Sequence, residues 1–197
     1  MEGFCASRPK VLLALNGYGT ILELTLSAMA CAGCLRGIVV CARCEDIREI
    51  EQCAEKILPD IERIVVPGGN TRQESVFAGL QALKGKATHV LVHDAARPFC
   101  PPELIRSAAE RCVQSGACIL AVPVKATLKK AKNCNVAQTV PRREMWEAQT
   151  PQAFDYDLLI DAYERAFADG YTGTDDSELV ERLGHAVEII EGTDANI

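Results

Sequence analysis

The residues best suited to chemistry lie in the segment His-Val-Leu-Val-His-Asp-Ala-Ala-Arg-Pro, residues 89 to 98. A run of strand-forming residues ends at His93 and Asp94, and Pro98 follows directly after Arg97. Buried strands of α/β sheets often deliver a carboxylate to the C-terminal edge of the sheet, where such folds bind ligands. An aspartate there suits a divalent metal ion, and an arginine three residues later suits a phosphate. Taken alone, the segment fits a strand followed by a solvated turn equally well.

A second candidate segment begins at Gly68 and Gly69 and continues as Asn-Thr-Arg-Gln-Glu-Ser to Ser75. Glycines let the backbone approach a ligand closely, and a helix beginning near Thr71 would point its unpaired N–H groups the same way. A Gly-Gly pair before a helix is weak evidence by itself, because a plain tight turn is at least as common.

Alternating strands and helices must position these segments. The pattern predicts strands over residues 37–42, 61–66, 88–93, 117–122, 146–149 and 186–190. It predicts helices over 20–32, 46–57, 71–83, 102–115 and 156–169, and a last one capped by Thr174 and ended by Gly184. Such alternation indicates an α/β fold with a parallel-rich mixed sheet and helices on both faces. Two short β-like runs between residues 124 and 141 predict a projecting hairpin.

Length and composition narrow the class of protein. A chain of 197 residues that is 48% hydrophobic can form one domain with a substantial core, spanning residues 1–197. The formal net charge of -6, without a block of lysines and arginines, argues against nucleic-acid binding. No apolar run approaches the roughly 18 residues of a membrane span, and the first residues lack the layout of a signal peptide. We therefore expect a cytoplasmic enzyme.

The ten cysteines include two CxxC pairs, Cys31 with Cys34 and Cys41 with Cys44. The six residues between the pairs are fewer than the roughly 15 to 20 that zinc ribbons usually leave. Cys41 also ends a run that reads as a buried strand. Reduced cysteines acting as small apolar residues are the preferred interpretation, with zinc as the alternative.

Three further segments complete a specific pattern. They are Ala-Val-Pro-Val-Lys-Ala-Thr-Leu-Lys at 121 to 129, Trp-Glu-Ala-Gln-Thr-Pro-Gln-Ala-Phe at 146 to 154, and Thr-Asp-Asp-Ser-Glu-Leu-Val-Glu at 174 to 181. In this order, and together with the two segments above, they resemble the 2-C-methyl-D-erythritol 4-phosphate cytidylyltransferases of the non-mevalonate isoprenoid pathway. The resemblance runs from about residue 9 to 197. It implies a Rossmann-like nucleotidyltransferase sandwich that transfers CMP from CTP to methylerythritol phosphate and releases pyrophosphate.

The resemblance also implies roles for particular residues. Asp94 would hold Mg²⁺, while Arg97 and Thr150 would contact the substrate phosphate. Cytosine and ribose would be read by Gly68, Gly69, Asn70 and Ser75. His93 fits a neutral histidine packed at the strand end better than a catalytic base, because an attacking phosphate dianion needs no base.

The hairpin, at about residues 124–145, would be a dimerisation arm in this family. It would deliver Thr127 and Arg142 to the substrate pocket of the partner in a homodimer, where Arg142 would hold the phosphate for in-line attack. Without the resemblance, Arg142 and its neighbour Arg143 would read as solvated charges. Lys10, which follows Pro9, resembles the lysine that stabilises charge on the phosphates in the transition state.

The chain departs from the family pattern at three places. The family's Ala-Ala-Gly-x-Gly-x-Arg loop has no counterpart around Gly3-Phe4-Cys5, and Arg8 is too close to Lys10 to supply its arginine. A second substrate-positioning lysine, which follows Asp-x-Asn-Ile in the family, is missing after Ile197. Ala126 stands where an aspartate is usual. We expect a fragment of a longer protein rather than a degenerate member, because the internal motifs are well preserved.

Two alternative functions stay open at this point. A ribitol 5-phosphate cytidylyltransferase resembles the chain across most of these motifs, although Ala95-Ala96 leans toward the methylerythritol enzyme. A catalytically impaired, dimer-forming family member would explain the missing loop and lysine.

Overall fold

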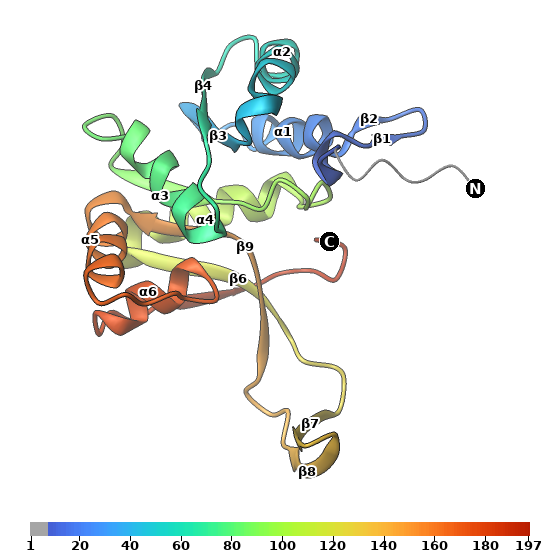
Figure 1. Ribbon diagram of the computed structural model, residues 1–197, viewed down its shortest axis with the longest axis vertical. Helices are drawn as coiled ribbons and strands as arrows, with labels where there is room; N and C mark the ends of the chain where they lie inside the picture. Colours follow the sequence, from blue (N-terminus) through green and yellow to red (C-terminus); the bar gives the residue numbers. More distant parts are fainter. Residues whose placement is uncertain (1–7) are drawn as a thin grey trace.

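The computed structural model describes residues 8–197 (Figure 1). The Gly3-Phe4-Cys5 segment, compared above with the family's glycine-rich loop, lies outside the described residues. The principal strands are β3 (Gly37–Ala42), β4 (Glu62–Pro67), β5 (His89–Val92), β6 (Ala117–Pro123), β9 (Trp146–Asp155) and β10 (Glu188–Glu191). The helices are α1 (Ile21–Cys31), α2 (Ile47–Ile57), α3 (Arg72–Ala82), α4 (Pro102–Ser115), α5 (Tyr156–Ala168) and α6 (Asp176–Arg182). The α/β fold expected from the sequence is confirmed.

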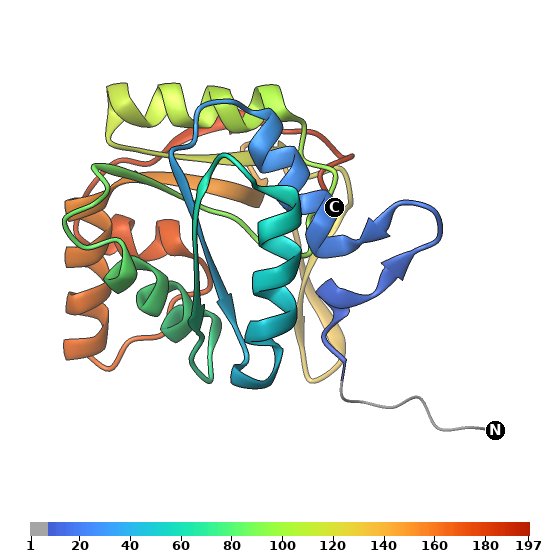
Figure 2. The same cartoon turned by 90° about the horizontal axis from the view of Figure 1, so that it is seen from above.

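The strands form a mixed arrangement divided between two main sheets. The larger sheet has the order β10-β6-β9-β5, with β9 antiparallel to both neighbours and β10 parallel to β6. A separate parallel pair joins β3 to β4 (Figure 2). Within the described residues, β3 pairs only with β4 and β5 only with β9. One edge of β3 and one edge of β5 therefore carry backbone groups outside any described ladder.

Helices cover both faces of the larger sheet, as predicted. α4 packs on one face, against β5, β6, β9 and β10, while α5 and α6 lie on the other (Figure 1). The α5 side holds an apolar cluster that includes Phe154, Leu159 and Tyr163, and the α4 side holds one that includes Ile105 and Leu120. A third cluster joins α1 and α2 to β3. These layers fix the strand ends that carry the candidate site.

Strand β9 is longer than the sequence analysis predicted. It runs to Asp155, whereas the prediction stopped at residue 149, before Thr150 and Pro151. The register with β6 shifts there, because Ile119 faces Gln152 whereas Leu120 faces Gln149. Proline has no N–H for a ladder, so it sits at this irregularity and the strand resumes beyond it.

The helix caps explain where α1, α3 and α6 begin. Thr20 forms the predicted capping box with Glu23. At α3 only half of the box is present, because Thr71 accepts from the Glu74 N–H while the Glu74 side chain accepts from Asn70. The prediction that Thr174 caps α6 is wrong: the cap is Asp175, which accepts from the Glu178 N–H at 2.9 Å. An ionised carboxylate is the stronger acceptor for these N–H groups.

Two hairpins complete the fold. β7 (Leu128–Lys132) and β8 (Asn135–Val140) form an antiparallel pair that projects from the body of the molecule (Figure 1). Asn133 and Cys134 turn it with positive φ angles, as two-residue hairpin turns require. Near the N-terminus a short helix, η1 (Lys10–Leu12), leads into β1 (Ala14–Leu15) and β2 (Gly19–Thr20), which the sequence analysis missed.

The fold bears on the position of Cys41 and on membrane spans, both of which the sequence raised. Cys41 lies in β3, as predicted, against Gly79 of α3, and burial raises the pKa of its thiol. No helix in the described part of the chain is long and apolar enough to cross a membrane.

Candidate active site

Asp94 is the second residue after the end of β5, and its carboxylate lies between two arginines from different segments. Its Oδ1 lies 3.4 Å from Arg72 Nε, and its Oδ2 lies 3.2 Å from Arg97 Nε. The Asp94 side chain is 38% exposed, so the carboxylate is fixed in direction yet open to a ligand. The end of a sheet strand therefore presents one oriented carboxylate beside two permanent positive charges. The sequence indicated Asp94 and Arg97, and the structure adds Arg72.

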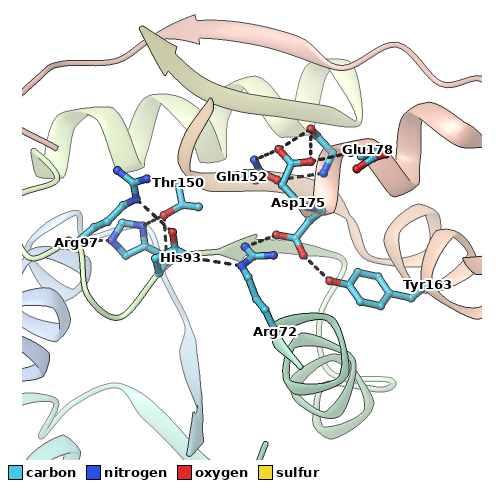
Figure 3. Close-up of polar contacts among 11 residues, drawn as sticks. Arg72, His93, Arg97, Thr150, Gln152, Tyr163, Asp175 and Glu178 are labelled. Atoms are coloured by element: carbon cyan, nitrogen blue, oxygen red, sulfur yellow. Dashed lines mark hydrogen bonds and ion pairs between the residues drawn. The ribbon is translucent and has the colours of Figure 1, made fainter. Parts of the chain in front are cut away.

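His93 and Thr150 fix the backbone of the same turn (Figure 3). The Thr150 hydroxyl accepts from the Asp94 N–H at 3.0 Å and lies 3.0 Å from His93 Nδ1, while His93 Nε2 lies 3.2 Å from the Arg97 carbonyl. A carbonyl can only accept, so Nε2 carries the proton and Nδ1 accepts from Thr150. Burial lowers the pKa of His93, which favours this neutral ring. The packed, neutral histidine expected from the sequence fits this arrangement.

Arg72 joins Asp94 to a buried carboxylate on another helix. Its Nη2 lies 2.7 Å from Asp176 Oδ2, and the Asp176 side chain is 0% exposed. The other oxygen of Asp176 accepts from the Tyr163 hydroxyl. Burial lowers the pKa of Arg72, but the hydrogen bond and charge of Asp176 outweigh it and raise the pKa overall. The guanidinium is therefore a fixed positive charge, which Figure 3 shows between His93 and Tyr163.

Glutamines fasten the start of α6 to the rest of the site. Gln152 of β9 accepts from the N–H groups of Asp176 and Ser177 and donates to Asp175 at 2.9 Å. Gln73, next to Arg72 on α3, donates to the Tyr171 carbonyl and accepts from the Gly173 N–H. The Thr-Asp-Asp-Ser segment is thus held against α3 and β9 by buried polar contacts.

Asn196 connects the last described segment to the Asp94 turn. Its side-chain amide donates to the Thr150 carbonyl at 2.9 Å, and its own carbonyl accepts from Arg97 Nη1 at 2.8 Å. Asn196 is fully buried. Arg97 is therefore oriented from two sides, by Asp94 and by the backbone of Asn196.

The loop between β4 and α3 is closed by Ser75. The Ser75 hydroxyl accepts from the Gly69 N–H at 3.1 Å and donates to the Thr71 carbonyl at 2.9 Å. A Cβ on Gly68 would lie 2.8 Å from Ser75 Oγ, closer than real contacts allow, so any other residue there would displace the Ser75 hydroxyl. The Asn70 N–H donates to Glu74 at 2.6 Å. The predicted nucleotide loop is compact, and Arg72 joins it directly to Asp94.

The structure brings most predicted residues together, but not all. Asp94, Arg97 and Thr150 share one network, and the loop 68–75 joins it through Arg72. Lys10 is exposed in η1 and makes no side-chain hydrogen bond or ion pair to this network in the described part of the chain. Thr127 and Arg142 are exposed at the base of the hairpin, where Arg142 donates to the Lys125 carbonyl.

The donor set at Asp94 suits a particular kind of metal ion. Among residues 8–197 there is no group of three or more His, Cys, Asp or Glu side chains that could hold a metal. Mg²⁺ is commonly bound by one or two carboxylates together with substrate phosphates, rather than by an all-protein cage. A single oriented carboxylate fits that mode of binding and does not fit a structural zinc or calcium site.

Sequence reasoning missed the residues that support the site. The sequence pattern assigns no role to Arg72, Gln152 or Asn196, and it indicates Asp176 only as a favourable charge at a helix start. One signal was available, because two consecutive aspartates begin α6 and only one can cap it. The second, Asp176, then needs a partner, and a buried carboxylate calls for a cation.

Comparison with known proteins identifies this arrangement. A solved 4-diphosphocytidyl-2C-methyl-D-erythritol synthase from Anaerococcus prevotii superposes with a TM-score of 0.86 and 33% identity, covering 94% of this chain and 85% of that one. The 2-C-methyl-D-erythritol 4-phosphate cytidylyltransferase structure from Thermus thermophilus gives 0.79 and 32%, covering 96% and 86%. The fold is that of an α/β nucleotidyltransferase.

The sequence comparison defines the family. A profile of the 2-C-methyl-D-erythritol 4-phosphate cytidylyltransferase family, IspD, matches residues 3–197. The enzyme of that name from Shouchella clausii is 41% identical over 196 residues, which cover 98% of this chain and 83% of the relative. The chain belongs to this family of cytidylyltransferases.

Proposed function

We propose that this chain transfers the CMP group of CTP to 2-C-methyl-D-erythritol 4-phosphate and releases pyrophosphate, as a step in isoprenoid precursor synthesis. The observation that carries the proposal is family membership over residues 3–197, combined with an oriented Asp94 between Arg72 and Arg97. The relatives described above carry the methylerythritol name, which favours this substrate over ribitol 5-phosphate.

The reaction requires positioning more than acid–base chemistry. A phosphate oxygen of the sugar phosphate attacks the α-phosphorus of CTP, and the bond from that phosphorus to the departing pyrophosphate oxygen breaks. The attacking phosphate is already ionised, so no residue has to remove a proton. The task of the protein is to align the two phosphates and to offset their charge.

Asp94 is the residue that would hold Mg²⁺. When bound with the nucleotide, the ion would supply charge neutralisation and orientation of the phosphate oxygens. The Asp94 carboxylate is suited to this role because Arg72 and Arg97 fix its direction while more than a third of it stays exposed.

Arg97 and Thr150 would contact the phosphate of the sugar. Arg97 keeps N–H groups beyond those given to Asp94 and Asn196, since guanidinium has five. Thr150 already accepts from the Asp94 N–H and donates to His93, which leaves one lone pair of its hydroxyl. A contact from Thr150 to the phosphate would therefore require its proton to turn away from His93.

The loop from Gly68 to Ser75 would bind the cytidine. Its glycines give close backbone access, and Gly68, Gly69, Asn70 and Ser75 would read the base and the ribose. Ser75 contributes in a second way, because its hydroxyl holds the Gly69 N–H and so keeps the loop in shape.

The remaining roles depend on assembly. We propose a cytoplasmic homodimer in which the hairpin supplies Thr127 and Arg142 to the partner's pocket. Arg142 uses part of its guanidinium on the Lys125 carbonyl and keeps further N–H groups for a phosphate. Lys10, exposed on η1, would stabilise charge on the CTP phosphates.

The test is pyrophosphate release by the protein with CTP and Mg²⁺, comparing methylerythritol phosphate with ribitol 5-phosphate. We expect release with methylerythritol phosphate and little with ribitol 5-phosphate. Faster release with ribitol 5-phosphate would contradict the substrate assignment. Binding of CTP without release from either substrate would instead favour a catalytically impaired family member.

A further inference from the structure

Four side chains from four different elements form a continuous line into the site. Tyr163 of α5 donates to Asp176 of α6, Asp176 pairs with Arg72 of α3, and Arg72 reaches Asp94 after β5. The first two are almost fully buried, the last two about 39% and 38% exposed. The line therefore runs from the core outward and ends at the carboxylate that faces solvent.

Both carboxylate oxygens of Asp176 are engaged by its neighbours in this line. One carboxylate oxygen accepts from Tyr163 and the other from Arg72 Nη2, while the backbone N–H of Asp176 is held by Gln152. A buried carboxylate with both oxygens bonded cannot rotate without losing a partner. Asp176 thus fixes where the guanidinium of Arg72 lies.

Arg72 then acts on one specific oxygen of Asp94. Its Nε faces Oδ1, whereas Arg97 Nε faces Oδ2. The planar fork of arginine allows Nη2 to be held by Asp176 while Nε points to Asp94. A lysine would carry the same charge, but its single ammonium group could not donate to Asp94 and Asp176 with this geometry.

We infer that Arg72, anchored by Asp176 and Tyr163, is a positioning residue that sets the rotation of the Asp94 carboxylate for the metal–nucleotide complex. The inference rests on the proposed function, because it takes Asp94 as the metal carboxylate. It concerns residues that touch neither substrate in this assignment and that act through Asp94 alone.

The experiment measures the dissociation constant of CTP by calorimetry, with and without Mg²⁺ and without sugar phosphate, so that no turnover occurs. The ratio of the two constants is the gain in CTP binding that depends on the metal. Asp94→Asn should abolish this gain. Arg72→Lys should reduce it by about tenfold, as is typical for residues that orient a metal carboxylate. Tyr163→Phe, which removes one hydroxyl from the anchor, should reduce it by roughly threefold.

A matched control tests whether removing any buried tyrosine hydroxyl changes the metal-dependent gain in CTP binding. Tyr156, also on α5, is buried and donates its hydroxyl to the Leu80 carbonyl at 2.9 Å, away from the site. Tyr156→Phe should leave the ratio unchanged. In assays of pyrophosphate release, Arg72→Lys should raise the Mg²⁺ concentration for half-maximal rate most and Tyr163→Phe less, whereas Tyr156→Phe should need the same concentration as wild type.

The outcomes separate the inference from the proposed function. If Asp94→Asn abolishes the metal-dependent gain while Arg72→Lys and Tyr163→Phe keep it, the positioning role is wrong. If Asp94→Asn itself keeps the gain, the assignment of Asp94 in the proposed function fails. Should Arg72→Lys not fold, Tyr163→Phe decides, because it removes only a hydroxyl group.

Discussion

Arg72 and Asp176 are 104 positions apart in the chain and form an ion pair of 2.7 Å whose carboxylate is completely buried. The pair joins α3, whose first turn belongs to the predicted nucleotide loop, to α6, which begins within the Thr-Asp-Asp-Ser motif. The pair therefore links the beginnings of α3 and α6, which the sequence analysis treats as separate motifs. Stability and ligand binding should both depend on this pair.

Removing the cation from this pair should destabilise the fold. Arg72→Met leaves Asp176 charged and buried without its counter-ion, and a loss of about 3 to 5 kcal/mol in the free energy of unfolding is expected. Urea denaturation measures it. The control is Arg8→Met, which breaks an exposed pair with Glu49 and should cost at most about 1 kcal/mol.

The same pair offers a second comparison. The double variant Arg72→Met with Asp176→Leu removes both charges, so it should be more stable than Arg72→Met alone, since no buried charge remains unpaired. If instead the two effects added, the ion pair would not be the interaction that matters for stability.

Arg142 provides a test of the hairpin as an arm that reaches a partner. Arg142→Ala should lower the rate of turnover by about 10² to 10³, the usual cost of one preorganised charge donor, and leave CTP binding nearly unchanged. Arg143→Ala, at the neighbouring exposed position, should have little effect. A loss of CTP affinity would mean that Arg142 acts on the other substrate.

Mixing two inactive variants can show which subunit supplies Arg142. A pocket in an Arg142→Ala and Asp94→Asn mixed dimer can have an intact Asp94 together with an intact Arg142 from the partner. We therefore expect activity to return on mixing and subunit exchange. If mixing restores nothing while the two variants are shown to exchange subunits, Arg142 does not act in the partner's pocket.

Ser75 should affect nucleotide binding through the shape of its loop. Ser75→Ala removes the acceptor for the Gly69 N–H, and CTP should bind about three- to tenfold more weakly, which is the usual effect of one lost hydrogen bond. Ser107 is a matched control, because it also donates to the carbonyl four residues earlier but lies on α4. Equal effects of Ser75→Ala and Ser107→Ala on CTP affinity would contradict the assignment of the loop.

Glu23 should make the stability of α1 depend on pH. The hydrogen bond from Lys56, followed by that from the Thr20 N–H, lowers the pKa of Glu23 in the folded protein. Because the folded pKa lies below the unfolded value of about 4.3, this stabilisation is present above that value and is lost as pH falls through the folded pKa.

The variant Glu23→Gln isolates this contribution. Wild type should be more stable than Glu23→Gln at pH 7, and the difference should shrink as the pH is lowered below about 4. Denaturant titrations at several pH values measure the difference. Lys56→Met should reduce the same pH dependence, and a difference that stays constant with pH would exclude a role for the Glu23 charge.

The sequence predicted the elements with clear periodicity and end signals. The strand at 37–42 and the helix at 102–115, with Pro102 at its start and Gly116 after it, have the predicted bounds. The misses have local causes. The extension of β9 beyond Pro151 depends on a shift in the pairing with β6, and the short β1 and β2 strands carry no hydrophobic alternation long enough to detect.

The residues of the site also divide into those that the sequence could predict and those that it could not. Asp94, Arg97 and the Gly68-Gly69 turn could be predicted from the sequence, because strand ends and glycine pairs can be recognised from residue types alone. The supporting residues Arg72, Asp176 and Asn196 could not be predicted, because their roles depend on tertiary contacts such as Arg72 with Asp176, 104 positions apart, and Arg97 with Asn196, 99 positions apart. Whether Lys10, Thr127 and Arg142 act as the resemblance implies stays a prediction.

The bond from Arg97 to the carbonyl of Asn196 also bears on how the protein is made. During synthesis, the residues of β5 and the Asp94 turn are made long before residue 196. The Asn196 carbonyl that orients Arg97 becomes available only after a further 99 residues have been added. Contacts between residues this far apart close large loops and are expected to form late in folding. A nascent chain with α1, β3 and α3 already in place would still lack this contact, so Arg97 would reach its final orientation only after residue 196 has been made.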